Sequence, residues 1–276
     1  MTDAQGALDE ARYLMGNAEP AVSSILVSSS PYLNNPRFRD VYAQMGLKRD
    51  GHDLPSAYLI PEVQRAFDEV TPAGLLDELL EEARGRLPEF ADWLDRRFVS
   101  RFAAKDLARH APGTLGAELR RFITESGMEV DFMFRAEARS DLEYLNKRRV
   151  QVHDIEHMVT GFDPSPVGEI ALIVANIEAN DRYFGSGLAA ELNRFGTFLV
   201  STSLMRAGLH YPNILHAYFE GIALGRSLGR RQTRPLFMIQ WEEFLDWSLT
   251  DIRSHFGFDE APAPDHWAWT YKNASG

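Results

Sequence analysis

The stretch 140–169 constrains the fold more than any other part of the sequence, because it reads as two consecutive helices. Ser140 heads a capping-box pattern that begins a helix, and no residue interrupts that helix before Gly161. Ser165 followed by Pro166 is typical of an N-cap and a first-turn proline, so a second helix is expected there. The linker is short, and we therefore expect the two helices to form an antiparallel hairpin.

Four side chains that can bind a divalent metal lie in this predicted hairpin. His153 and His157 are four residues apart and share one helix face, with Asp154 on the flank of that face. Glu169 falls in the first turn of the second helix, at the level of His157. Several ionisable groups are costly to bury together unless something compensates their charge, so the cluster predicts a metal site. Neutral imidazoles and carboxylates suit zinc, iron(II) and manganese, and oxygen-rich variants suit magnesium.

Two known patterns of metal-dependent hydrolases fit this cluster poorly. A zincin needs a glutamate directly after the first histidine, where this chain has Asp154, so a metallopeptidase is not expected. Phosphohydrolases with a His-Asp doublet need a further histidine upstream and an aspartate downstream. His110 and Asp181 could fill those places, without a supporting pattern, and His52-Asp53 reads as a loop feature. Taken singly, each histidine of the cluster reads as an ordinary surface or core residue, and only their combination with Asp154 and Glu169 favours a metal site.

The bulk composition limits the class of protein. Hydrophobic residues make up 45% of the chain, which is enough for a core, and the net charge of −11 argues against a nucleic-acid binder. The chain has no cysteine, which excludes disulfides, iron–sulfur clusters and thiolate zinc sites. We expect no targeting signal at the N-terminus, and the apolar runs are too short to span a bilayer. A cytoplasmic protein is the resulting expectation, with contact to a membrane surface left open.

Helical spacing of apolar residues runs through the rest of the chain, and no sustained period-two alternation interrupts it. The fold is therefore predicted to be all-α. Besides the hairpin, helical segments are expected over residues 73–84, 90–102, 115–126, 188–205, 214–228 and 236–255.

Three regions follow from this pattern. Residues 1–87 are polar and broken, and read as an N-terminal extension of short helices and loops. Residues 88–258 are expected to form the main helical domain. Residues 259–276 contain two prolines and read as an extended C-terminal tail.

The order His-Asp-x-x-His-x11-Glu resembles the signature of the ubiquinone (coenzyme Q) biosynthesis proteins, specifically the fourth of the Coq proteins. The resemblance covers roughly residues 88–258, and flanking residues extend it in order: Pro112-Gly113-Thr114-Leu115-Gly116, Tyr144, Arg148, Gly161, Gly168-Glu169-Ile170, Gly229-Arg230-Arg231, Pro235-Leu236 and Trp241-Glu242.

The resemblance implies an all-helical protein in which His153, Asp154, His157 and Glu169 hold a divalent metal, usually discussed as zinc. It also implies a hydrophobic tunnel or cleft beside the metal for a polyprenyl chain. The implied activity is that of a lyase, an oxidative decarboxylation at C1 of a polyprenylated hydroxybenzoate or a related aromatic acid. Arg148 joins the four ligands as a candidate catalytic residue. The implied partners are a prenylated aromatic or isoprenoid lipid, other quinone biosynthesis enzymes, a second copy of the chain and, peripherally, the inner membrane.

This sequence departs from the family pattern at several places. The linker 162–166 is proline-rich, only Glu178 represents an otherwise longer motif after Glu169, and residues 1–87 have no recognised counterpart. Two alternatives therefore stay open. One is a non-catalytic prenyl-lipid binder that presents substrate to partner enzymes, and the other is an unrelated metal-dependent hydrolase.

Four further features are open between a structural and a binding role. Arg149 precedes His153 by four residues and could offer a fork to a substrate carboxylate, or belong to a plain surface run. A basic cluster could hold a phosphate or an acidic headgroup, or could be a solvated face: Arg226, Arg230, Arg231 and Arg234. An apolar stripe could belong to the core or line a tunnel: Phe195, Phe198, Leu199, Met205, Tyr218 and Phe219. Aromatic residues of the tail could pack on the body or touch a membrane: Trp267, Trp269 and Tyr271.

Overall fold

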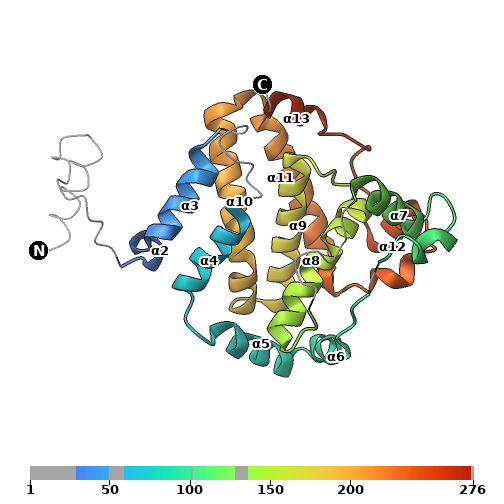
Figure 1. The fold of residues 1–276 in the computed structure, drawn as a ribbon, viewed down its shortest axis with the longest axis horizontal. Coiled ribbons are helices and arrows are strands. Elements are labelled where there is room, and N and C mark those ends of the chain that lie inside the picture. The colour runs from blue at the N-terminus through green and yellow to red at the C-terminus, as the bar shows by residue number, and fades with distance from the viewer. Residues whose placement is uncertain (1–28, 50–58, 101, 128–135, 275–276) are drawn as a thin grey trace, which may run out of the picture.

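The computed structural model describes residues 29–49, 59–100, 102–127 and 136–274, and this part of the chain consists of helices joined by loops (Figure 1). No strand occurs in these residues, where the only extended pairing is an isolated antiparallel bridge between Thr114 and Ser248. The predicted all-α class is confirmed. The helices are α2 (Pro31–Asn34), α3 (Pro36–Leu47), α4 (Ile60–Val70), α5 (Leu75–Arg86), α6 (Pro88–Arg96), α7 (Leu115–Ser126), α8 (Asp141–Thr160), α9 (Pro166–Phe184), α10 (Leu188–His210), α11 (Leu215–Arg231), α12 (Leu249–Phe256) and α13 (Trp269–Ala274). Short 3-10 turns lie at Asp106–Arg109, Pro212–Ile214, Leu236–Met238 and Trp241–Phe244.

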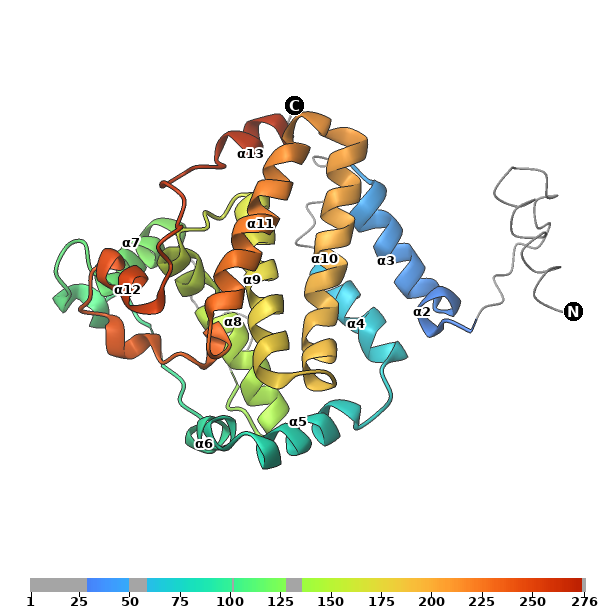
Figure 2. The ribbon, with the colours of Figure 1, turned by 180° about the vertical axis from the view of Figure 1, so that it is seen from behind.

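Four long helices, α8 to α11, form the centre of the molecule (Figures 1 and 2). Helices α3 and α4 cover α10 on one side, and α7 and α12 pack against α8 on the other. Helices α5 and α6 close one end of the bundle, and α13 lies at the opposite end.

Helices α9 and α11 approach each other backbone to backbone. Three glycines spaced four residues apart, Gly221, Gly225 and Gly229, line the face of α11 that meets α9. A Cβ atom on Gly225 would overlap the carbonyl oxygen of Ala171, and one on Gly229 would overlap that of Ala175. The absence of side chains on this face therefore sets the distance between the two helices.

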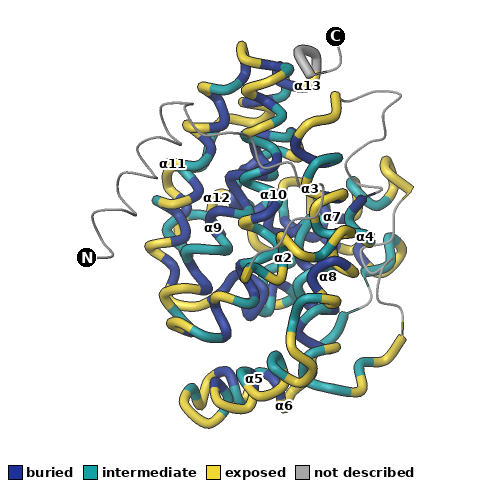
Figure 3. The backbone as a smooth tube through the Cα atoms, turned by 90° about the vertical axis from the view of Figure 1, so that its left-hand side faces the viewer, coloured by how far each residue is buried: buried dark blue, intermediate teal, exposed yellow. Residues whose placement is uncertain are grey.

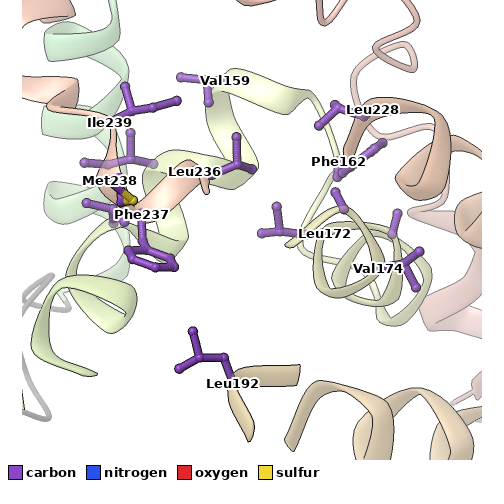
Figure 4. Close-up of a cluster of buried hydrophobic side chains, with 14 of the residues drawn as sticks. Val159, Phe162, Leu172, Val174, Leu192, Leu228, Leu236, Phe237, Met238 and Ile239 are labelled. Carbon is purple, nitrogen blue, oxygen red and sulfur yellow. The ribbon is translucent and has the colours of Figure 1, made fainter. Parts of the chain in front are cut away.

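Two apolar cores hold the helices together, with buried segments running through the centre of the bundle (Figure 3). The main core extends from Leu80 on α5 to Trp267 near the C-terminus, and Figure 4 shows part of it, where Leu236 and Phe237 gather near Leu172 and Leu192. The smaller core joins α3 and α4 to Phe198 on α10. Helix α5 thus belongs to the main core, although it precedes the boundary predicted at residue 88.

The helix expected over residues 236–255 is not formed, and this prediction is wrong. Leu236, Phe237, Met238 and Ile239 are all buried. Four consecutive side chains point in four directions around a helix, so a single helix face cannot bury them all. The chain instead makes two 3-10 turns, and α12 begins only at Leu249 after the N-cap Ser248.

The C-terminal tail is not wholly extended, because α13 forms over Trp269–Ala274. Trp267 is fully buried and its indole N–H donates to Glu220 at 3.1 Å, whereas the Trp269 and Tyr271 side chains remain exposed. Of the two roles considered for the tail aromatics, packing on the body therefore applies to Trp267.

The residues of the predicted apolar stripe on α10 and α11 differ in their exposure to solvent. Phe198 and Tyr218 are buried, while Met205 and Phe219 are 45% and 58% exposed. Phe195 and Leu199 are half-buried against the smaller core. No helix among the described residues combines the length and the apolar character needed to cross a membrane.

Candidate metal centre

The predicted hairpin is formed by α8 and α9. Ser140 caps α8 by accepting the N–H of Glu143 at 3.2 Å, and Gly161 ends the helix in the left-handed conformation with φ 76°. Ser165 caps α9 by accepting the N–H of Gly168 at 3.1 Å. The local signals read from the sequence are the ones that the structure uses.

The linker between the helices lies tightly against the start of α9. A Cβ atom on Gly168 would overlap the carbonyl oxygen of Asp163, so this position accommodates only glycine. The Asp163 carboxylate in turn accepts the backbone N–H of Ser165 at 3.1 Å and that of Trp267 at 2.9 Å. These contacts hold the first turn of α9, and with it Glu169, in a defined position relative to the end of α8.

Three donor groups converge at this end of the hairpin. Nε2 of His157 lies 3.0 Å from Oε2 of Glu169 and 3.3 Å from Nε2 of His153. Nε2 of His153 lies 3.3 Å from Oε1 of Glu169. The His157 side chain is 9% exposed, whereas those of His153 and Glu169 are each 38% exposed, so the group is open to solvent on one side.

The hydrogen bond on the far side of His157 suits this group to a cation. Nδ1 of His157 lies 2.8 Å from the carbonyl oxygen of Phe162, which can only accept a hydrogen bond. In the neutral ring Nδ1 therefore carries the proton, and Nε2 turns a lone pair toward Glu169 and His153. Converging lone pairs repel one another unless a proton or a cation lies among them. Two imidazoles and a carboxylate thus fit a divalent cation such as zinc, iron(II) or manganese.

The ionisation of the group follows from the same contacts. Burial by itself lowers the pKa of His153, but the charge and hydrogen bond of Glu169, with the charges of Glu156 and Asp154, raise that pKa to about 9. Burial by itself raises the pKa of Glu169, but the two histidines hold it well below its usual range. Without a metal the group binds a proton instead.

Asp154, the fourth predicted ligand, is not part of the converging group. Among the residues that the structure describes, only His153, His157 and Glu169 offer donor atoms within 4.8 Å of one another. Residues next to each other on a helix point about 100° apart, so Asp154 cannot share the face of His153. It acts on His153 through its charge, and direct ligation by Asp154 stays a prediction.

Arg148, the remaining predicted site residue, engages a different part of the protein. The residue is 1% exposed, and its guanidinium makes a two-pronged ion pair with Glu242, at 2.7 and 2.9 Å. It also donates to Gln151 at 3.1 Å and to the carbonyl oxygen of Ile239 at 3.0 Å. Arg148 lines a cavity of about 330 Å³ together with Tyr144 and other aromatic side chains. These contacts join α8 to residues 236–244, and a catalytic role for Arg148 stays a prediction.

Sequence reasoning missed Glu156. This residue is 3% exposed and accepts a hydrogen bond from Asn176 of α9 at 2.9 Å. Burial raises the pKa of Glu156 to about 7, although Asn176 and the charges of His153, His157 and Arg149 act in the opposite direction. The spacing could have indicated it, since Glu156 follows Arg149 by seven residues, about two helical turns on the same face.

The residues considered for a phosphohydrolase lie apart from the centre. Nδ1 of His110 pairs with Asp246 at 2.6 Å, and Asp181 accepts a hydrogen bond from Asn193 at 2.9 Å. His52-Asp53 lies outside the described residues.

The basic cluster of the sequence is largely paired with glutamates. Arg226 contacts Glu178 at 2.8 Å, and two others pair in the same way: Arg231 with Glu260 at 3.0 Å and Arg234 with Glu89 at 2.8 Å. These side chains are 38–56% exposed, as on a solvated face.

The fold and the donor group together define an all-helical protein with a two-histidine, one-carboxylate group at the end of a helical hairpin. Residues 94–262 match the family described as Coenzyme Q (ubiquinone) biosynthesis protein Coq4. Because the match spans more than half of the chain, the chain belongs to this family, as the resemblance over residues 88–258 predicted.

A solved structure shares the fold. It is the crystal structure of a protein from Nostoc punctiforme PCC 73102 that carries a provisional name as a ubiquinone biosynthesis protein. The two chains superpose with a TM-score of 0.59 at 22% sequence identity, over 82% of this chain and 99% of the other. The comparison with curated proteins yields no match.

Proposed function

We propose that this chain is a metal-dependent enzyme of ubiquinone biosynthesis that acts on a polyprenylated hydroxybenzoate or a related aromatic acid. In the proposed reaction the aromatic acid, dioxygen and water give the ring hydroxylated at C1, carbon dioxide and hydrogen peroxide, so dioxygen is the two-electron oxidant. Family membership supports the pathway. The observation that carries the metal dependence is the convergence of His153, His157 and Glu169 at 3.0–3.3 Å.

Each residue of the group has a defined part in this proposal. His153, His157 and Glu169 would hold the cation, and the carbonyl oxygen of Phe162 keeps the His157 ring in the tautomer that can do so. A bound divalent cation would stabilise the negative charge on the carboxylate, and the charge that develops on the ring as carbon dioxide leaves. The exposed sides of His153 and Glu169 leave room for substrate to reach it.

The partners belong to the same proposal. We place the polyprenyl chain along α10, where Phe195 and Leu199 are only half-buried. Peripheral contact with a membrane is supported by exposed apolar side chains on α10, α11 and α13: Met205, Leu209, Phe219 and Trp269. Other quinone biosynthesis enzymes would be met at that membrane.

Turnover tests the proposal directly. Purified protein loaded with zinc, iron(II) or manganese would receive 3-prenyl-4-hydroxybenzoate labelled in its carboxylate, with and without oxygen. We expect labelled carbon dioxide and a hydroxylated ring only with metal and oxygen. His157→Ala should abolish both metal content and release, while His266→Ala, which changes an exposed histidine that pairs with Glu220, should retain them.

Two results would change the assignment. Equal metal content in wild type and His157→Ala would exclude the centre. Lipid binding without any release of carbon dioxide would instead favour a non-catalytic protein that presents prenylated substrate to partner enzymes.

A further inference from the structure

Arg149 lies one helical turn before His153 on the same face of α8, and its charge is poorly satisfied. Among the described residues its guanidinium makes one hydrogen bond, a 3.3 Å contact from Nη2 to the carbonyl oxygen of Leu192 on α10. No carboxylate of the described residues lies within ion-pair distance of it. An arginine has five N–H donors, so most of its donor capacity has no partner in the protein.

Burial makes the poorly paired guanidinium of Arg149 energetically costly. Arg149 is half-buried between α8 and α10, and burial lowers its pKa, with only the charge of Glu156 acting the other way. Taking a charged group out of water is unfavourable unless it is paired and hydrogen-bonded. Neighbouring Arg148 shows the contrast, because its guanidinium has Glu242, Gln151 and Ile239 as partners.

Glu156 does not serve as the missing partner of Arg149. Although it lies two turns from Arg149 on the same face, its carboxylate is engaged by the side-chain amide of Asn176 at 2.9 Å. The ligand face therefore carries, in order along α8, an under-used guanidinium at Arg149, the donor His153 and, a turn further, the donor His157.

This order suits a molecule with an anionic head. A divalent cation held by two neutral imidazoles and one carboxylate keeps a net positive charge, and Arg149 adds a second positive group about one turn, 6 Å, away along the helix. The planar fork of an arginine matches the two oxygens of a carboxylate.

We propose that Arg149 recognises the carboxylate of the substrate and so orients the ring against the metal centre. Naming that carboxylate as the substrate's rests on the proposed function. Arg149 is then the residue that determines specificity for an aromatic acid over its neutral counterpart.

Binding to a matched pair of ligands tests this role. The probes are 3-prenyl-4-hydroxybenzoate and its carboxamide, which has the same shape without the charge, titrated calorimetrically into zinc-loaded protein. We expect wild type to bind the acid at least about tenfold more tightly than the amide. Arg149→Gln should lose most of this preference and keep only the part that the charge of the bound zinc supplies. Arg149→Lys should keep more of it, and Arg65→Gln, a change of an exposed arginine on α4, should behave as wild type.

The outcomes separate this role from others. An acid preference that is undiminished in Arg149→Gln, or is absent from wild type, overturns the proposal. A lowered zinc content in Arg149→Gln also overturns it, because Arg149 would then support the metal ligands instead of the substrate. An Arg149-dependent preference without release of carbon dioxide leaves this inference standing and contradicts only the proposed enzyme activity.

Discussion

At the scale of single residues, the candidate centre is a place where a proton and a cation compete. In the metal-free protein the pKa of His153 is raised to about 9, so His153 carries a proton at neutral pH. That proton must leave before Nε2 can bind a metal. Metal affinity should therefore rise with pH, about tenfold per unit for one displaced proton, and level off above pH about 9.

Competition with a chelator of known affinity, between pH 6 and 10, measures this dependence, and the protons released on metal addition give an independent count. Metal affinity rises with pH because the raised pKa keeps the His153 ring protonated at low pH, where it cannot bind the metal. A pH-independent affinity would contradict the assignment of His153 as a ligand.

The ion pair between Arg148 and Glu242 gives a second prediction at this scale. Glu242→Gln leaves the guanidinium of Arg148, a residue that is 1% exposed, without its counter-charge. Breaking a buried pair from one side typically costs about 3–5 kcal/mol, so we expect a loss of that order in the free energy of unfolding, measured with urea. The neighbouring exposed Glu243→Gln is the control and should stay within about 0.5 kcal/mol of wild type.

At the scale of elements, the contact between α9 and α11 depends on glycine. Gly225→Ala places a methyl group against the carbonyl oxygen of Ala171 and must push the helices apart, at a cost of about 1–3 kcal/mol. Gly208→Ala makes the same change on α10, where the new Cβ would meet no atom within 4 Å apart from its chain neighbours and the backbone of its own helix.

Gly208→Ala should instead stabilise the protein by about 0.5–1 kcal/mol, because alanine loses less backbone entropy in a helix than glycine. Thermal unfolding of both variants measures the difference. Similar effects in the two variants would show that helix propensity, and not the approach of α9 to α11, decides the outcome.

At the scale of the whole molecule, the centre joins the two helices of the hairpin, and a bound metal should stabilise the folded chain. Because the ligands come together only on folding, free metal at 100 times its dissociation constant should add about 2.7 kcal/mol to the free energy of unfolding. Calorimetry with metal-buffered protein measures this gain. We expect His157→Ala to lose it, whereas a gain that persists in this variant would place the stabilising metal elsewhere.

Much of the centre could be predicted from the sequence, because its signals are local. Ser140, Gly161 and Ser165 act on their own helix ends, so they define the hairpin without reference to the rest of the chain. The four-residue spacing of His153 and His157 likewise needs only the helix, and the short linker then brings Glu169 to them.

Only the tertiary structure decided which charged groups meet across elements. Arg148 is drawn to Glu242, 94 residues away, and Glu156 is buried against Asn176 of α9. The helix expected over 236–255 failed for the same reason, since the main core buries its first four side chains on all sides. Periodicity and caps act over a few residues, whereas these contacts depend on how distant segments pack, which no local pattern records.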